Sequence, residues 1–258
     1  MTRQLVRAPL LGRDRVGPLY HLLSFDLERE VEAAPGQFAM VRCADWGHAP
    51  LLSRPMSLVE GGRRPTILIK VVGEGTRRMA LAAPGQPFDL MLPLGNRWSA
   101  CPEGVTPVFV AGGCGIAPLL FFARELRARG TRPVALYGGR SKDDLPLDED
   151  MSRVSDLRLL TEDGSRGVKG LVTALLEPAL QEVGRKAKVY TCGPHRMMAA
   201  VATICAKLDV ECEACLETPM ACGYGVCLGC PVKTSSGGYL HACVDGPCVD
   251  ARTISWNR

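Results

Sequence analysis

The middle of the chain reads Pro107-Val108-Phe109-Val110-Ala111-Gly112-Gly113-Cys114-Gly115-Ile116-Ala117-Pro118-Leu119. An apolar run typical of a strand buried on both faces meets a glycine-rich turn and then a helical run that extends to Arg129. Glycines at such a junction let a nucleotide pyrophosphate approach the positive N-terminal end of the helix. The turn is not the Rossmann fingerprint, because the third glycine of that pattern is missing at the required offset. The stretch predicts a βα unit whose candidate nucleotide-binding residues are Gly112, Gly113, Gly115, Ala117 and Pro118.

Strand-like and helix-like segments alternate downstream of this unit. Strands are expected at 133–137, 157–161 and 188–192, with a charged loop at 142–150 and helices at 171–182 and 195–207. This alternation predicts a parallel sheet flanked by helices, and such sheets bind ligands at the carboxyl ends of their strands. The candidate nucleotide contacts at these ends are Asp163, Gly164, Cys192, Gly193 and Pro194. Cys192 is either a neighbour of the nicotinamide ring or a thiol in a tight turn with no role of its own.

The segment upstream of Thr106 has a different pattern. Short apolar runs at 37–42, 65–72 and 88–92 are separated by Gly, Pro and Asp turns, which is the spacing of an antiparallel barrel. Two motifs stand out here, the Arg54-Pro55-Met56-Ser57 tetrapeptide and the run from Leu68 to Thr76. Each alone is weak. Together they supply the groups that a flavin dinucleotide needs. These are a guanidinium for the pyrophosphate, a hydroxyl and backbone amides for the ring system, and a turn of small residues that lets the phosphate approach closely.

Cysteine is concentrated at the C-terminal end of the chain. Seven of the twelve cysteines fall between residues 212 and 258. Four and two residues separate Cys222, Cys227 and Cys230, and Cys243 follows after twelve more, which is the plant-type ferredoxin spacing. Glycines in the loop leave the backbone uncrowded, so that amide N–H groups can turn toward sulfur. The pattern predicts a [2Fe–2S] cluster bound by these four thiolates.

A zinc site is the alternative for the same segment. Cys212 with Cys215, and Cys227 with Cys230, form two knuckle-like pairs, and zinc favours four thiolates. That arrangement would leave Cys222 and Cys243 without a role, which favours the iron–sulfur interpretation. Cys212, Cys215 and Cys248 are then expected to be small buried apolar residues, with a second metal site or a redox-active pair as the other interpretation.

The bulk properties place limits on the protein class. The chain has 258 residues and a net charge of +4 that is spread along the sequence, so neither a nucleic-acid nor a membrane footprint stands out. It lacks a signal-like start and a membrane-length apolar run, and its cysteines fit metal ligation in a reducing compartment; we therefore expect a cytoplasmic location. Three domains are predicted: a β-barrel at 1–102, an α/β domain at 103–210 and a small cluster domain at 211–258.

The motifs occur in an order that resembles a known family. The Arg54–Ser57 tetrapeptide, the glycine turns, Cys192-Gly193-Pro194, Met220-Ala221-Cys222-Gly223 and Asp245-Gly246-Pro247 are similar to those of the electron-transfer subunits of dihydroorotate dehydrogenase B, within the ferredoxin–NADP reductase superfamily. The resemblance covers nearly the whole chain. It implies a ferredoxin reductase-like FAD barrel, an NAD domain and a [2Fe–2S] domain. By the same resemblance, the FAD-binding residues are Arg54, Pro55, Met56, Ser57, Leu68, Ile69, Lys70, Gly75 and Thr76.

The resemblance also implies a partner and a reaction. The partner is an FMN-containing catalytic subunit that oxidises dihydroorotate to orotate in pyrimidine biosynthesis, joined in a heterotetramer of two copies of each chain. Electrons then pass between that FMN, the cluster, FAD and NAD. Two alternatives stay open. One is the small subunit of a flavin-based transhydrogenase or sulfide dehydrogenase, in which an aspartate often replaces the ligand found here as Cys222; the other is a non-catalytic binding module held together by zinc.

Overall fold

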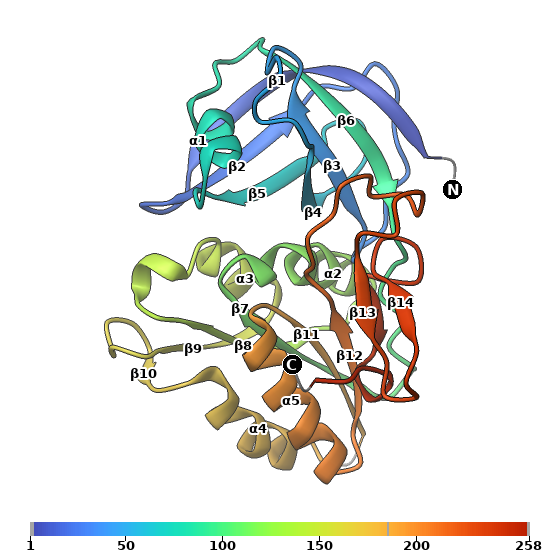
Figure 1. The fold of residues 1–258 in the computed structure, drawn as a ribbon. Helices are drawn as coiled ribbons and strands as arrows, with labels where there is room; N and C mark the ends of the chain where they lie inside the picture. Colours follow the sequence, from blue (N-terminus) through green and yellow to red (C-terminus); the bar gives the residue numbers. More distant parts are fainter. Residues whose placement is uncertain (1–2, 185, 257–258) are drawn as a thin grey trace.

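The first part of the chain folds into a closed antiparallel barrel in the computed structural model, which describes residues 3–184 and 186–256 (Figure 1). Its strands follow the order β1-β2-β5-β4-β3-β6 around the barrel. Their bounds are β1 (Gln4–Arg15), β2 (Tyr20–Phe25), β3 (Phe38–Cys43), β4 (Arg54–Glu60), β5 (Thr66–Lys70) and β6 (Pro87–Leu94). Side chains alternate between the barrel interior and the outside, as β-geometry requires. The expected barrel is therefore confirmed.

The second part forms a seven-stranded sheet with the order β10-β9-β8-β7-β11-β12-β15, in which only β15 runs antiparallel to its neighbour. The strands are β7 (Thr106–Gly112), β8 (Val134–Gly139), β9 (Asp156–Thr161), β10 (Val168–Lys169), β11 (Ala187–Cys192), β12 (Glu211–Cys215) and β15 (Cys248–Asp250). The helices are α2 (Ile116–Ala128), α3 (Asp148–Val154), α4 (Leu176–Val183) and α5 (His195–Lys207). The expected parallel sheet with flanking helices is confirmed.

Alternation along β7 explains why both faces of this sheet are covered. Phe109 and Ala111 pack with residues of α2 on the face toward the barrel, whereas Val108 and Val110 pack with residues of α4 and α5 on the opposite face. Figure 1 shows α2 and α3 between the sheet and the barrel. An apolar strand of this kind is stable only when both of its faces are buried.

Three local expectations differ from the structure. The charged loop expected at 142–150 contains a short 3₁₀ helix (Lys142–Asp144) and the start of α3. Acidic residues gather in the first turn of α3, where they stabilise the positive N-terminal end of the helix. The turn expected after Val72 is the start of α1 (Glu74–Leu81). The single helix expected at 171–182 is a 3₁₀ helix (Val172–Leu175) that continues into α4.

The C-terminal segment is shared between several layers. β12 and β15 extend the main sheet, and β13 (Pro231–Lys233) pairs with β14 (Tyr239–His241) in a separate hairpin. A 3₁₀ helix (Ala251–Thr253) follows β15. The predicted domain limits stay a prediction, and their outermost residues, 1–2 and 257–258, lie outside the described ranges. The segment after residue 211 is nevertheless tied to the sheet by backbone hydrogen bonds rather than appended to it.

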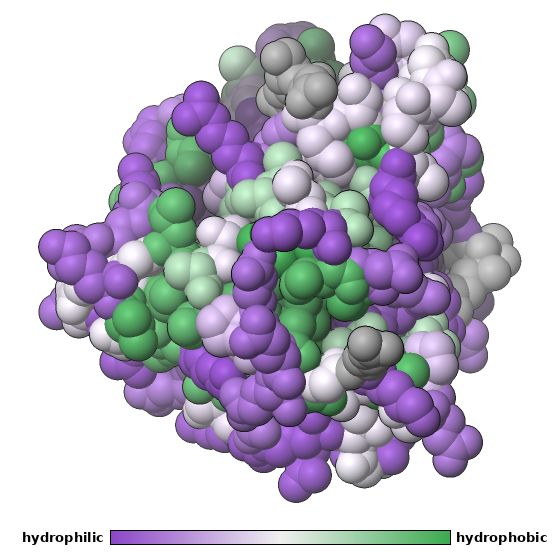
Figure 2. Space-filling view, turned by 90° about the horizontal axis from the view of Figure 1, so that it is seen from below, coloured by the Kyte–Doolittle hydropathy of each residue, from purple (hydrophilic) through white to green (hydrophobic). Residues whose placement is uncertain are grey.

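The face of the molecule away from the barrel is mainly hydrophilic. Seen from below the view of Figure 1, hydrophilic side chains frame a hollow in which apolar side chains gather (Figure 2). Among the helices in residues 3–184 and 186–256, none is long and apolar enough to cross a membrane.

Asn96 fastens the C-terminal segment to the end of the barrel. Its side-chain amide donates to the carbonyl of Cys248 at 2.7 Å, and its side-chain oxygen accepts from the Cys248 backbone N–H at 2.9 Å. The Asn96 backbone N–H donates to the carbonyl of Gly246 at 2.6 Å. Gly95 precedes it with φ +71°, and a Cβ there would lie 2.5 Å from the ring of Pro247. The segment therefore approaches the barrel too closely for any larger residue at position 95.

We predict that Asn96→Ala destabilises the protein by about 2 kcal/mol, or roughly 4–8 °C in thermal midpoint, because the Cys248 peptide loses both of its side-chain partners in a part-buried site. Thermal unfolding followed by circular dichroism measures this. Gln86→Ala is the matched control, since Gln86 bonds exposed Asp45 and water can replace it there. An Asn96→Ala midpoint no lower than that of Gln86→Ala would contradict the role of Asn96.

Candidate cofactor sites

A cavity of about 680 Å³ lies between the barrel and the sheet, and we call it the barrel–sheet cavity. The barrel contributes Pro55, Met56 and Ser57 from β4, and the sheet domain contributes residues that follow β7, β11 and β12. Many of its lining residues were predicted from the sequence to contact a cofactor. The members of the predicted set that line it are Pro55, Met56, Ser57, Leu68, Lys70, Thr76, Gly112, Ala117, Gly193 and Pro194.

Strand alternation divides the predicted β5 residues into two groups. Leu68 and Lys70 face the barrel–sheet cavity, whereas Ile69 is fully buried in the barrel core. Successive side chains on a strand point to opposite sides, so three consecutive residues cannot all contact one ligand through their side chains. Ile69 could contact a cofactor only through its backbone.

The predicted pyrophosphate arginine lies against the start of α1. A Cβ on Gly75 would lie 2.2 Å from Nε of Arg54, so only glycine leaves room for this guanidinium. The Arg54 side chain also lies over the ring of Trp46, 5.0 Å from its centroid, and donates to the carbonyl of Leu52. Burial, and then repulsion from Arg42, lower the pKa of Arg54. Within the described residues neither arginine has an acidic partner, so the local charge suits an anionic group.

Thr76 organises the backbone that precedes α1. Its hydroxyl oxygen accepts from the backbone N–H groups of Val72 at 3.0 Å and Gly73 at 3.3 Å. The same hydroxyl donates to the carbonyl of Gly73 at 3.1 Å. Thr76 is buried and also lines the barrel–sheet cavity, so it shapes the cavity wall by holding the turn closed.

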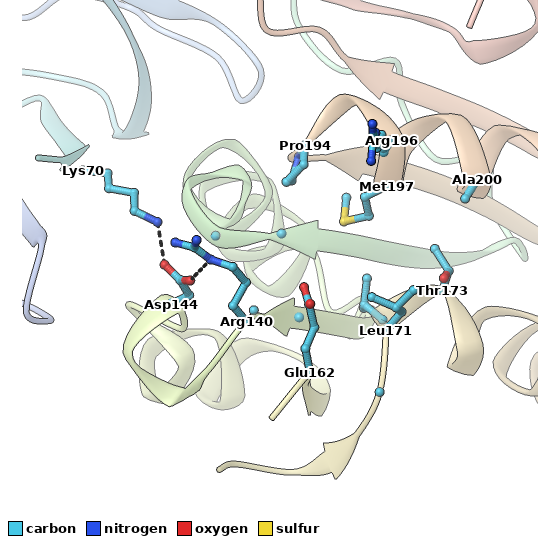
Figure 3. Close-up of a pocket in the computed structure, with 16 residues that line it drawn as sticks. Lys70, Arg140, Asp144, Glu162, Leu171, Thr173, Pro194, Arg196, Met197 and Ala200 are labelled. Carbon is cyan, nitrogen blue, oxygen red and sulfur yellow. Dashed lines mark hydrogen bonds and ion pairs between the residues drawn. The ribbon is translucent and has the colours of Figure 1, made fainter. Parts of the chain in front are cut away.

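A second cavity of about 620 Å³ runs along the carboxyl edge of the sheet, and we call it the sheet-edge cavity (Figure 3). Gly112 and Gly113 line it at the end of β7, as the glycine-rich turn predicted. Gly113 has φ +53°, which glycine adopts freely. Gly115 lies behind the turn, where a Cβ would meet the carbonyl of Cys192 at 2.0 Å. Pro118 is buried in the first turn of α2, where proline needs no N–H partner.

The two cavities meet at a cluster of charged side chains. Lys70 of the barrel forms an ion pair with Asp144 of the sheet domain, with Nζ 2.5 Å from Oδ1, and Arg140 donates to the other carboxylate oxygen at 3.0 Å. The Tyr20 hydroxyl donates to Asp144 at 2.8 Å. Burial by itself raises the pKa of Asp144, but these hydrogen bonds bring it down to about 2. Figure 3 shows Lys70 reaching from the barrel to Asp144 at this junction.

The turns after β9 and β11 only partly follow the prediction. Asp163 accepts from the backbone N–H and the hydroxyl of Ser165 at 2.9 and 2.7 Å, so its carboxylate closes its own turn, and Gly164 provides the positive φ that the turn requires. Gly193 and Pro194 line the cavities, whereas the Cys192 thiol is buried and does not. The hydrogen bond that the Cys192 thiol donates to Cys215, together with burial, raises the pKa of Cys192 well above its ordinary value.

Several cavity residues were not predicted from the sequence. Tyr20 begins β2 and most of the others lie in loops or at helix starts; of those with charged or phenolic side chains, only Glu162 lies directly beside a predicted residue, Asp163. The others depend on contacts between segments distant in sequence, which no local pattern signals. The missed residues with charged or phenolic side chains are Tyr20, Arg140, Asp144, Glu162, Arg196 and Glu217.

The four predicted cluster ligands lie in the C-terminal segment as two pairs. Sγ of Cys230 is 3.3 Å from Sγ of Cys243, and the thiols of Cys222 and Cys227 also share a hydrogen bond. Within the described parts of the chain, no three ligating side chains converge as one metal ion would require. A [2Fe–2S] cluster takes two thiolates at each iron, so two pairs fit it better than they fit a single zinc ion.

The loop backbone also favours thiolates. Burial would raise the pKa of Cys222, but the backbone N–H groups of Tyr224, Cys227 and Val226 and the Cys227 thiol lower it to about 6. The N–H of Gly229 donates to the sulfur of Cys227 at 3.4 Å. Gly223 and Gly225 both have positive φ, and a Cβ on Gly223 would lie 2.3 Å from the Met40 side chain. Loop and barrel therefore fit together only with glycine at position 223.

The surplus cysteines are buried as expected. Cys212, Cys215 and Cys248 expose 5%, 2% and 3% of their surface. Cys215 and Cys248 face each other across β12 and β15, and Cys215 lines the barrel–sheet cavity.

The chain matches two family models. Residues 217–255 match the iron–sulfur cluster binding domain of dihydroorotate dehydrogenase B, and residues 109–203 match the oxidoreductase NAD-binding domain. Among solved structures, that of an NADH-dependent reduced ferredoxin–NADP oxidoreductase, studied for flavin-based electron bifurcation, is 28% identical and superimposes with a TM-score of 0.85 over 96% of this chain and 90% of that one. The ferredoxin reductase of carbazole 1,9a-dioxygenase, 17% identical with a TM-score of 0.72 over 81% of this chain and 67% of that one, shares the fold.

Curated relatives are similar over nearly their whole length. Proteins from Desulforamulus reducens and from Caldanaerobacter subterraneus subsp. tengcongensis are each 34% identical over 257 residues, which cover 96% and 98% of this chain and 97% and 99% of theirs. A protein from Clostridium acetobutylicum is 34% identical over 227 residues, 88% of each chain. All three are named as the electron transfer subunit of dihydroorotate dehydrogenase B (NAD(+)). With identity at this level along the whole chain, the protein belongs to the family of dihydroorotate dehydrogenase B electron-transfer subunits.

Proposed function

We propose that this chain passes electrons between a catalytic subunit that oxidises dihydroorotate to orotate, in pyrimidine biosynthesis, and NAD. The observation that carries the proposal is the adjacency of three sites. The sheet-edge cavity and the barrel–sheet cavity share Lys70, Gly112 and Pro194. Phe38 and Met220 line the barrel–sheet cavity and also pack in the group of side chains that contains Cys230 and Cys243. One layer of side chains thus separates the middle site from the cluster thiols.

The order of the sites matches the chemistry of the cofactors. Nicotinamide exchanges electron pairs as hydride, an iron–sulfur cluster exchanges single electrons, and flavin exchanges both, so flavin belongs in the middle. The protein contributes binding, orientation and exclusion of water. We assign FAD to the barrel–sheet cavity, with Ser57, Leu68, Lys70 and Thr76 around it, and NAD to the sheet-edge cavity. The cluster ligands are Cys222, Cys227, Cys230 and Cys243.

Arg54 is assigned to the FAD pyrophosphate, because it is a partly buried cation without an acidic partner among the described residues. Replacing it with alanine should weaken FAD binding about 10- to 100-fold, the value of a charge-assisted hydrogen-bond pair. The ratio of flavin to protein absorbance after gel filtration, followed by titration with FAD, measures this. Arg64→Ala, which removes an exposed arginine with no side-chain hydrogen bond or ion pair to the described residues, is the control. Full flavin occupancy in Arg54→Ala would refute the assignment.

Cys227 is the most accessible of the four proposed ligands. Cys227→Ser should abolish the visible absorbance of the cluster and lower the iron and acid-labile sulfide content, while FAD stays bound in its separate cavity. Cys101→Ser, in the loop before β7, makes the same chemical change outside the cluster segment and should leave the cluster intact. A normal cluster spectrum in Cys227→Ser, or zinc in place of iron in the unmodified protein, would overturn the ligand assignment.

The cluster loop also presents a surface for the catalytic subunit. Tyr224, Val226, Leu228 and Val244 are 36%, 72%, 59% and 45% exposed, which is unusual for apolar residues that surround one site. A partner that covers them excludes water and brings its own redox group close to the thiols. We propose that the FMN-containing catalytic subunit docks here, in a heterotetramer of two copies of each chain. A cytoplasmic location belongs to the same proposal and is supported by twelve free thiols.

Placing a charge in this surface tests the docking. Val226→Asp should abolish complex formation with the catalytic subunit in size-exclusion chromatography and abolish dihydroorotate-dependent NAD reduction. The isolated variant should still reduce dyes with NADH, because its proposed FAD and NAD sites lie outside the cluster loop. Val168→Asp, which changes a valine on β10 that is 58% exposed, is the control. If Val226→Asp assembles as well as the control, the surface lies elsewhere.

The small subunit of a flavin-based transhydrogenase is the second candidate, supported by the bifurcating oxidoreductase structure. Cys222 favours the dihydroorotate-linked function, because an aspartate is frequent at this position in the other group. The catalytic subunit that co-purifies from the native host decides between them: one that turns over dihydroorotate supports the main proposal, and one that binds ferredoxin or NADP supports the alternative.

A further inference from the structure

The two ends of the sheet-edge cavity differ in what they can bind. One end shares Lys70, Gly112 and Pro194 with the barrel–sheet cavity, whereas Glu162 and Leu171–Thr173 line only the sheet-edge cavity. Hydride transfer requires the reacting atoms to approach within about 3–3.5 Å. The nicotinamide half therefore occupies the shared end, and the adenosine half lies toward Glu162. This orientation rests on the proposed function.

The charged side chains at the adenosine end differ in whether another side chain already binds them. The Arg140 guanidinium donates through Nε to Asp144, which is also bonded to Lys70, so this one carboxylate orients both cations and offsets one of their two charges. Glu162 makes no hydrogen bond or ion pair through its carboxylate with any residue in the described ranges, and its backbone N–H is fixed to the carbonyl of Gly139 at 3.1 Å. Figure 3 shows its carboxylate directed into the cavity, between Arg140 and Leu171.

The carboxylate of the next residue, Asp163, is not placed to bind a ligand in the sheet-edge cavity. Asp163 accepts both hydrogen bonds that close its turn onto Ser165 and does not line the cavity. Arg196, at the start of α5, lines the cavity without a side-chain partner in the described residues, and it lies next to Pro194 at the shared end. That position places Arg196 nearer the diphosphate than the adenosine ribose.

We propose that Glu162 makes this chain select NAD over NADP. A carboxylate at the adenosine ribose accepts a hydrogen bond from the 2′-hydroxyl, whereas it repels the 2′-phosphate of NADP. In NADP-binding sites of open α/β sheets, an arginine near the ribose binds the 2′-phosphate instead. The one arginine beside Glu162, Arg140, is occupied by Asp144.

Binding of ribose fragments tests the proposal without any redox step. Titration calorimetry should show the flavin-loaded protein binding ADP-ribose at least about tenfold more tightly than 2′-phospho-ADP-ribose. In Glu162→Gln the charge is lost but an acceptor oxygen remains, so affinity for 2′-phospho-ADP-ribose should rise about tenfold while that for ADP-ribose changes little. Glu162→Ala should in addition bind ADP-ribose less tightly, because the acceptor is removed as well.

Steady-state dye reduction should follow the same pattern. The kcat/KM ratio of NADH to NADPH should fall at least about tenfold in Glu162→Gln and stay unchanged in Glu103→Gln, an exposed glutamate in the turn that precedes β7, at the opposite edge of the sheet. Both variants lie in exposed turns, and retained flavin absorbance with an unchanged circular dichroism spectrum shows that they are folded.

The outcomes separate this inference from the proposed function. If the unmodified protein oxidises neither NADH nor NADPH, the proposed function fails. If it prefers NADH and Glu162→Gln keeps that preference in both measurements, only the role of Glu162 is wrong. A preference of the unmodified protein for 2′-phospho-ADP-ribose would also overturn the role of Glu162, and it would point to Arg140 or Arg196 as the phosphate ligand.

Discussion

The carboxylate of Asp144 forms a part-buried ionic link between the two large parts of this molecule. Lys70 and Tyr20 reach it from the barrel and Arg140 from the sheet domain, and these partners hold its pKa at about 2. The group is therefore charged at every physiological pH, and removing Lys70 would leave Arg140 as its only cationic partner among the described residues. Because Lys70 lines both cavities, the interaction that joins the domains also fixes the relative position of the two nucleotide sites.

The cluster segment is held in place by the same two parts, the sheet and the barrel. It returns to the main sheet through β12 and β15 and is fastened to the barrel by Asn96. Contacts at Gly95 and Gly223 leave no room for a side chain, so the loop can approach the barrel closely. Electron transfer over short distances needs this rigidity, since a cluster on a flexible tail would visit many distances from the flavin. The three sites are thus three regions of one packed body rather than three separate modules.

The family identity explains the distribution of chemistry along the chain. None of the assigned cofactor contacts needs to act as an acid or a base, because the cofactors supply the reactivity and the protein supplies position and charge. The charged residues that matter are those without an ion pair among the described residues, such as Arg54 beside Arg42, and Glu162 at the end of the sheet-edge cavity. Exposed apolar residues around the cluster loop fit the docking surface that we propose, since contiguous exposed apolar side chains often mark protein–protein contacts.

The sequence by itself determined the order of barrel, parallel sheet and cluster segment, the glycine turn at 112–115 and the four cysteines, because each depends on the spacing of near neighbours along the chain. Only the tertiary structure decided which members of each motif face a ligand. It buried the side chain of Ile69 in the barrel core, directed the Glu162 carboxylate into the sheet-edge cavity while Asp163 closes its own turn, and paired Lys70 with Asp144. Those outcomes depend on segments that meet only after folding, and a local pattern carries no information about such partners.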